Sequence, residues 1–579
     1  MSTFLKMSRG ALCFLVAGLA QPVPAIAAPT IRDGSPTAAA CEALGFKPPP
    51  REDERRVGGV WRRSAKAYAP MALATPPPPP PPPAMAPPVP GAAYTTAPAY
   101  PTPPSDQGLD TERYPHAAVQ GVRRTADAPV STFSVDVDTA AYANVRRFLN
   151  DGQAPPRDAV RTEELINYFD YGYARPTDPA KPFQPFVAVA PSPWSPGHQL
   201  IQIGLQGYDI PRAERPPLNL VFLIDTSGSM SDEAKLPLAR KALNLLIDQL
   251  RPGDRVAMVA YAGSAGAVLA PTDGTQKLKM RCALTALEAG GSTAGGAGLD
   301  LAYALAQQNF DPKAVNRVIL MTDGDFNVGV ADPARLTDVV ADKRKTGVYL
   351  SIYGFGQGNY NDTLMQALAQ NGNGTAGYVD TLAEARRAFR DDFSGSLFPI
   401  ADDAKIQVEF NPATVSEYRL IGYETRLLNR EDFNNDQVDA GEVGSGVSVT
   451  ALYEITPVGQ PVASDPLRYG AAASPAAEAG ELAYLKVRYK LPGQATSQLM
   501  ERPIGARDVV GELTKAPEPV RFAVAVAAFG QKLRGDPWMS PAFTWDRIAD
   551  LAQGARGDDP FGQRAEFVQL VRAARDTAR

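Results

Sequence analysis

Histidine and cysteine are scarce in this chain. Its 579 residues include two histidines and three cysteines. Both histidines, His116 and His198, precede the most regular apolar runs, and we expect them at the surface rather than in an acid–base role. Three cysteines are too few for a disulfide scaffold. No serine-hydrolase elbow, Walker loop or His-Glu-x-x-His pair stands in a suitable context, so we do not expect an enzyme.

A strong charge bias is also lacking. The formal net charge is −5, and lysine and arginine do not gather in clusters with interleaved aromatic residues. Nucleic acid is therefore a poor candidate partner. After the first residues, no run reaches the roughly 18 to 20 apolar residues of a membrane-spanning helix. We expect contact with a membrane only through an anchor or a partner.

Residues 1–27 have the pattern of an export signal. Two basic residues precede the apolar segment 11–20, and the small residues at 25 and 27 suit a cleavage site. After cleavage, Cys41 and Cys282 would be the remaining cysteines. Neither Cys13 nor Cys41 follows a good lipobox, so a lipid anchor is disfavoured, although it stays open as an alternative. We therefore predict that the protein is exported.

Residues 28–128 are rich in proline and poor in periodic apolar pattern. An unbroken run of proline extends from 76 to 83. Such a segment cannot bury enough apolar surface to fold. We predict a disordered, extended linker that holds the folded part away from its point of departure.

Oxygen-bearing side chains follow the apolar run 218–224. That run has the length and hydrophobicity of a strand buried on both faces of an α/β sheet, where ligands collect at the carboxyl ends of strands. Asp225, Ser227 and Ser229 come next, at alternate positions that can aim toward one point. One carboxylate and two hydroxyls are hard donors, which suit Mg²⁺ or Mn²⁺. The segment predicts a cation site.

Two later segments complete a known pattern. A glycine-rich loop carries Thr293, and a second buried-strand run, 318–322, ends at Asp323. In this order and context, the three segments resemble the metal-ion-dependent adhesion site (MIDAS) of von Willebrand factor type A (vWA) domains. That site has the pattern D-x-S-x-S, then a distant threonine, then the aspartate of T-D-G. The metal-ligating residues that the resemblance implies are Asp225, Ser227, Ser229, Thr293 and Asp323.

The resemblance also implies how the site would work. The two serines would bind Mg²⁺ or Mn²⁺ directly, the two aspartates directly or through water, and Thr293 when a ligand is engaged. An open coordination position would accept an exposed Asp or Glu carboxylate of a partner protein. The function expected is metal-ion-dependent protein recognition or adhesion. The alternatives are an envelope scaffold whose metal site is structural, and an accessory subunit of a metal-dependent enzyme complex.

Strand and helix patterns alternate between residues 216 and 400, which predicts a Rossmann-like α/β fold with a mainly parallel sheet and helices on both faces. After 402 the apolar period becomes two, which is typical of a β-sandwich. A similar alternating segment at 200–205 precedes the vWA part. We therefore predict that the vWA domain is inserted in the sandwich, with buried or amphipathic helices at the C-terminus.

Residues 133–171 resemble the N-terminal flank of a bacterial family of exported vWA proteins, and that resemblance extends over about 110–579. It implies a periplasmic, envelope or cell-surface location. The predicted divisions of the chain are a signal peptide, a disordered linker, a flanking region of helices and sandwich strands, the vWA domain, a β-sandwich region and C-terminal helices, at 1–27, 28–128, 129–215, 216–400, 401–515 and 516–579.

Overall fold

The apolar run that begins at Leu218 forms the centre of a six-stranded sheet. The computed structural model describes residues 36–47, 112–135, 138–291, 295–324, 333–438, 440–465 and 480–578. The sheet order is β10-β9-β8-β5-β6-β7, and all neighbours are parallel except β6 and β7. The strands are β5 (Leu218–Asp225), β6 (Arg255–Tyr261), β7 (Ala265–Asp273), β8 (Val315–Thr322), β9 (Tyr349–Phe355) and β10 (Ala376–Val379).

Helices cover both faces of this sheet, which confirms the predicted vWA-type α/β arrangement. All residues of β5 are buried, with Phe222 in the apolar cluster on one face and Leu223 in the cluster on the other. On the first face lie α5 (Leu236–Gln249), α6 (Lys277–Thr285), α10 (Leu382–Arg386) and α11 (Phe393–Leu397). On the second lie α7 (Gly295–Gln308), α8 (Pro333–Arg344) and α9 (Asp362–Asn371). We call residues 218–397 the α/β body.

The remaining strands form two antiparallel sheets that face each other across one apolar core. The first has the order β1-β12-β15-β4-β3, and its strands are β1 (Arg123–Arg124), β3 (Phe183–Pro191), β4 (Gln199–Gly207), β12 (Val415–Ile421) and β15 (Ser448–Pro457). The second has the order β13-β2-β11-β16-β17, with β14 on β11. Its strands are β2 (Val130–Ser134), β11 (Pro399–Phe410), β13 (Leu427–Leu428), β14 (Val443–Gly444), β16 (Glu481–Lys490) and β17 (Ser497–Gly505).

The α/β body is inserted in this sandwich, as the sequence predicts. Strand β4 ends before the body begins, yet it pairs along its length with β15, which follows the body. Likewise β2, from the N-terminal flank, pairs with β11. Each sheet therefore requires chain from both sides of the insertion, and the sandwich cannot be completed by the C-terminal part alone.

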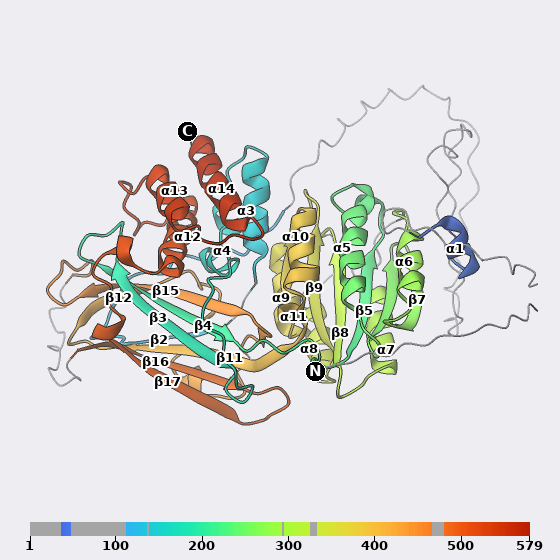
Figure 1. Ribbon diagram of the computed structural model, residues 1–579, viewed down its shortest axis with the longest axis horizontal. Helices are drawn as coiled ribbons and strands as arrows, with labels where there is room; N and C mark the ends of the chain where they lie inside the picture. Colours follow the sequence, from blue (N-terminus) through green and yellow to red (C-terminus); the bar gives the residue numbers. More distant parts are fainter. Residues whose placement is uncertain are drawn as a thin grey trace, which may run out of the picture.

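A helical layer covers the outer face of the first sheet (Figure 1). Its apolar cluster joins Phe522 and Phe567 to Ala188, Ala190 and Leu200 of β3 and β4. The helices are α3 (Ala140–Asn150), α4 (Thr162–Asn167), α12 (Glu518–Arg534), α13 (Trp545–Gly554) and α14 (Gln563–Thr577). Throughout the described residues, none of the helices has both the length and the apolar character required to cross a bilayer.

Part of the N-terminal segment is folded, contrary to our expectation for residues 28–128. Helix α1 (Ala38–Ala43) is joined to α6 by a disulfide between Cys41 and Cys282, and β1 lies on the edge of the first sheet. The cysteine count gave no reason to pair these two residues, which are separated by 241 positions. The signal peptide and the proline run 76–83 lie outside the described residues.

Removing the disulfide should destabilise the fold. A cross-link of this span restricts the unfolded chain, and native disulfides typically contribute about 2–4 kcal/mol. We expect Cys41→Ala/Cys282→Ala to lower the denaturant midpoint of the full chain, and the wild type in reductant to unfold at the same midpoint as the double variant. Equal midpoints for the oxidised wild type and the variant would contradict a stabilising role.

Buried ion pairs join the α/β body to the helical layer. Arg146 of α3 is 2% exposed and contacts Asp380, Glu384 (2.9 Å) and Glu566 (3.2 Å). A second guanidinium, that of Arg161, lies 2.6 Å from Asp362 at the start of α9. Buried charges of this kind require their partners, because an unpaired charge in the interior is costly. The α/β body and the helical layer are therefore held in one relative orientation by charge as well as by apolar contact.

One buried carboxyl in the helical layer should make stability depend on pH. Burial, with Glu424 nearby, raises the pKa of Glu163 to about 7. Since the folded-state pKa lies above the unfolded value, the contribution of Glu163 to stability is fully present at low pH and is lost as the pH rises through about 7. We expect Glu163→Gln to increase the free energy of unfolding at pH 8 by about 1–3 kcal/mol, which a higher melting temperature would show, and to have little effect at pH 5. Equal effects at both pH values would contradict this.

Candidate metal centre

The carboxyl end of β5 positions the first candidate ligand. Asp225 is fully buried, and its Oδ1 accepts a hydrogen bond from the backbone N–H of Ser227 at 2.8 Å. Its Oδ2 accepts from the hydroxyls of Tyr261 (3.1 Å) and Thr322 (3.3 Å) on the flanking strands β6 and β8. Three donors from separate segments thus hold the carboxylate in one orientation.

The two serines converge immediately after Asp225. Their side-chain oxygens, Ser227 Oγ and Ser229 Oγ, lie 3.0 Å apart at the start of a short 3₁₀ turn, η2 (Gly228–Ser231). The glycine loop that precedes Thr293 packs against this turn, because the Gly228 N–H donates to the Gly291 carbonyl at 3.0 Å. Thr293 itself lies outside the described residues.

Asp323 comes to the same place from β8, the parallel neighbour of β5. It is fully buried and interacts with Ser229, which places the second carboxylate beside the serine pair. The next residue, Gly324, has a φ of +105°, and a Cβ there would lie 2.6 Å from the Asn359 carbonyl oxygen. The glycine after the aspartate is thus required by the close passage of a neighbouring loop.

The two carboxylates differ in their electrostatics. Burial raises the pKa of Asp225 to about 6, and the charge of Asp323 adds to this rise. Burial acts in the same direction on Asp323, but hydrogen bonds from Asn359 and Lys235 outweigh it and lower the pKa of that carboxyl. Asp323 is therefore held as a carboxylate, whereas ionised Asp225 needs a cation that the described side chains do not supply.

This donor set fits a divalent cation. Among the described residues, no lysine or arginine forms an ion pair with Asp225, although two hydroxyls and a second carboxylate lie beside it. Nowhere in the described part of the chain do three or more His, Cys, Asp or Glu side chains form a metal-binding group. A cation here would thus depend on the serine hydroxyls. Such an all-oxygen set, with few carboxylates, is typical of Mg²⁺ or Mn²⁺.

Sequence reasoning missed the residues that hold the two carboxylates, among them the charged Lys235. It lies at the start of α5, and its Nζ is 2.9 Å from Asp323 Oδ2 and 3.4 Å from Asn359 Oδ1. Its stem passes over Gly356, where a Cβ would lie 2.3 Å from Lys235 Cγ. Nothing in the motif marks this lysine, because its contact depends on how α5 and the loop after β9 pack together.

Lys235 should weaken cation binding at the site. Its ammonium already neutralises Asp323, and a second cation placed nearby would be repelled. We expect Lys235→Met to bind Mn²⁺ roughly tenfold more tightly than the wild type in a calorimetric titration. Lys241→Met, which changes a 58% exposed lysine side chain on the same helix, is the matched control and should leave the affinity unchanged. Weaker binding by Lys235→Met would show instead that the lysine organises the site.

Family models match most of the described chain. The model for the von Willebrand factor type A domain matches residues 219–391, and one described as von Willebrand factor matches 108–202. A third, described as the C-terminal part of uncharacterized protein YfbK, matches 395–577. These limits agree with the α/β body and with the two parts of the chain that flank it.

The relatives of this chain match it over very different lengths. Uncharacterized protein YfbK of Escherichia coli (strain K12) is 44% identical over 472 residues, which cover 80% of this chain and 81% of that protein. Uncharacterized protein sll0103 of Synechocystis is 31% identical over 31% of this chain and 41% of its own. Human inter-alpha-trypsin inhibitor heavy chain H4 is 26% identical over a match that covers 35% of this chain and 23% of that protein.

Among solved structures, a von Willebrand factor type A protein from Catenulispora acidiphila covers 70% of this chain and 91% of its own, with 18% identity and a TM-score of 0.38. Mussel byssus proximal thread matrix protein 1, solved with a zinc-occupied MIDAS motif, covers 30% and 45%, with 22% identity and a TM-score of 0.26. The family follows from the extended sequence match and the domain models. This chain belongs to the YfbK-like family of von Willebrand factor type A domain proteins.

Proposed function

We propose that this protein recognises a partner protein through a divalent cation held by Asp225, Ser227, Ser229 and Asp323. The observation that carries the proposal is the buried Asp225 carboxylate, which has no ion-pair partner among the described residues but faces two convergent hydroxyls and a second carboxylate. In this proposal Thr293 joins the ligand set on the loop that Gly291 brings to the site.

Charge explains why such a site would attract an acidic ligand. Two carboxylates balance a divalent cation, and Lys235 offsets part of that negative charge. The site with its cation therefore keeps a positive surplus that favours a further carboxylate. Mg²⁺ and Mn²⁺ bound by few protein ligands retain exchangeable waters, one of which an Asp or Glu of the partner would replace.

Binding is proposed in preference to catalysis. Hydrolysis at a bound cation would require a general base or a second metal close to it. The two histidines are in the flanking parts, where His116 lies 3.0 Å from Asp158 and His198 lies 3.7 Å from Glu454. Neither belongs to the loops that carry the metal centre, so the cation would serve as a bridge between proteins.

We place this recognition in the bacterial cell envelope. The export-type leader supports this location, and the Cys41–Cys282 disulfide is consistent with an oxidising compartment. The proline-rich segment that follows the leader would then separate the folded part from its point of departure.

A peptide array tests the proposal with matched sequences. Each pair of peptides differs only by a central Asp or Glu against Asn or Gln. We expect the wild type to bind a subset of the acidic peptides in Mg²⁺ or Mn²⁺. This binding should disappear in chelator, and the Ser229→Ala variant should not show it. Binding that persists in chelator, or that does not discriminate Glu from Gln, would contradict recognition through the cation and favour a metal site that only braces the loops.

A further inference from the structure

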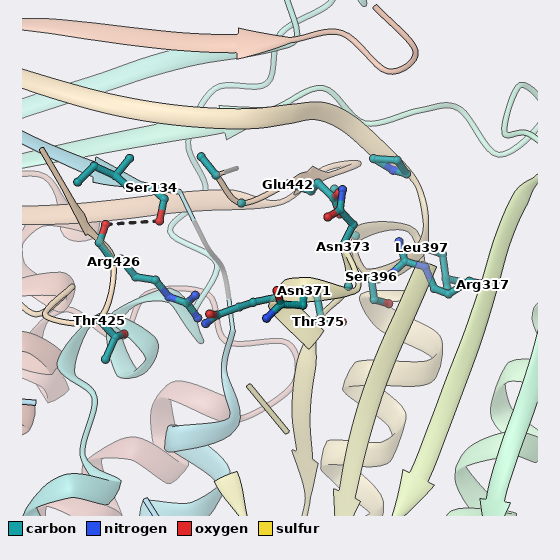
Figure 2. Close-up of a pocket in the computed structure, with 18 of the residues that line it drawn as sticks. Ser134, Arg317, Asn371, Asn373, Thr375, Ser396, Leu397, Thr425, Arg426 and Glu442 are labelled. Carbon is teal, nitrogen blue, oxygen red and sulfur yellow. Dashed lines mark hydrogen bonds between the residues drawn. The ribbon is translucent and has the colours of Figure 1, made fainter. Parts of the chain in front are cut away.

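A polar pocket lies between the α/β body and the sandwich (Figure 2). It is near the amino-terminal ends of β8 and β10, whereas the metal centre follows the carboxyl ends of β5 and β8. The volume of the pocket is about 310 Å³. Arg317, near the start of β8, lines this pocket, and Asp323 of the metal centre follows six positions later. At about 3.3 Å per residue, the two residues are roughly 20 Å apart. The pocket is therefore a separate site.

Arg317 is the unusual group in this pocket. It is 3% exposed, and its Nη1 donates to Ser351 Oγ at 2.6 Å. Its Nε has no hydrogen-bond partner, and no carboxylate in the described part of the chain forms an ion pair with it. Burial lowers the pKa of Arg317, and the charge of Glu442 offsets this only in part. A buried guanidinium donor without an acceptor is the arrangement that a bound oxyanion would complete.

The other arginine of the pocket is already engaged. Arg426 lies 3.1 Å from Asp138, and its backbone carbonyl accepts from the Ser134 hydroxyl. Figure 2 shows Arg426 and Arg317 on opposite sides of the pocket, with Asn371 and Asn373 between them. Arg317 can therefore bind a negative group of a ligand, whereas Arg426 is already paired within the protein.

Most of the remaining polar lining can bind hydroxyl groups. Short hydroxyl and amide side chains enter from both bodies, among them Thr375 and Ser396 from the α/β body and Ser134 and Thr425 from the sandwich. Glu442 adds a carboxylate that accepts hydrogen bonds and disfavours a ligand of high negative charge. The volume is at the lower end of the range for small-molecule sites.

We propose that this pocket binds a small hydroxylated acid. Its single carboxylate accepts from the guanidinium of Arg317, and its hydroxyls bond with the serine, threonine and asparagine side chains around it. Because the lining comes from both bodies, the ligand stabilises their contact. This site is independent of the cation and of the proposed partner recognition.

The test is a set of thermal melts in chelator, which keeps cations from the metal centre. The probes are glycerate, acetate and glycerol at equal concentrations, so that acid and hydroxyl are supplied together or alone. We expect glycerate to raise the melting temperature of the full chain by several degrees, acetate to raise it less, and glycerol to leave it unchanged. No response to glycerate, or an equal response to glycerol, would overturn the proposal.

Arg317→Met should abolish the glycerate response. It should melt at or above the ligand-free wild-type temperature, because it removes a buried charge with incomplete compensation. Arg255→Met, which changes an exposed arginine at the start of β6, is the matched control and should respond like the wild type. If Arg317→Met does not fold, Arg317→Lys decides, since it keeps the charge but loses the planar guanidinium donors. An undiminished glycerate response in the folded Arg317 variant would overturn the proposal.

Discussion

Mn²⁺ and Mg²⁺ should raise the melting temperature of the wild-type chain, and Asp225→Ala should abolish that rise. A cation that binds the folded state alone stabilises it by about 2.7 kcal/mol at a hundredfold excess over its dissociation constant. Asp225 is the carboxylate that three donors hold and that has no ion pair among the described residues, so its removal takes away the charge that the cation would neutralise. The measurement is a melt of each variant with each cation and with chelator.

The matched control for this experiment is Glu233→Ala. Its side chain is 87% exposed and lies just after the metal-binding turn, so the substitution removes the same charge from nearly the same place in the chain. We expect the control to respond like the wild type. A cation response that survives in Asp225→Ala would mean that the ion binds elsewhere, and the account of the site would be wrong.

The second large effect is expected at Arg146. Replacement by methionine keeps the apolar stem of the side chain but removes the guanidinium, so that Asp380 stays buried without that cation and Glu384 keeps only Arg387, at 2.6 Å. Breaking a buried pair from one side typically costs about 3–5 kcal/mol, because the remaining charge cannot reach water. We expect Arg146→Met to lower the denaturant midpoint strongly and to loosen the contact between α3 and α10.

An exposed arginine near the same seam provides the comparison. Arg386 on α10 is 50% exposed and lies 3.4 Å from Asp391. Its replacement by methionine should change stability by no more than about 0.5 kcal/mol. Similar midpoints for the Arg146 and Arg386 variants would show that the buried network does not hold the two bodies together.

The elements that sequence predicted best are the buried ones. Strands β5 and β8 are covered on both faces, so they stand out as continuous apolar runs, and the metal-binding turns follow directly. Strands β7 and β17 lie at sheet edges, are largely accessible, and show no clear alternation. Their patterns gave no prediction, because an edge strand does not need a fully apolar side.

Contacts between distant segments were harder to predict. The Cys41–Cys282 pair and the Lys235–Asp323 contact both depend on which surfaces meet after folding, and one sequence has no periodic signal for that. The sandwich was found because its alternating strands lie on both sides of the inserted body. Its first strand after the body begins at Pro399, slightly before the predicted boundary at 401.

Crystals of the full chain grown with Mn²⁺ and acetate would show directly whether Asp225 and its neighbours bind a cation. Anomalous scattering at the manganese edge would locate the ion without reference to the protein. We expect one strong peak in contact with Ser227 and Ser229, beside Asp225 and Asp323, with an acetate oxygen completing the coordination. A peak elsewhere, or no peak at this turn when manganese is in excess, would contradict it.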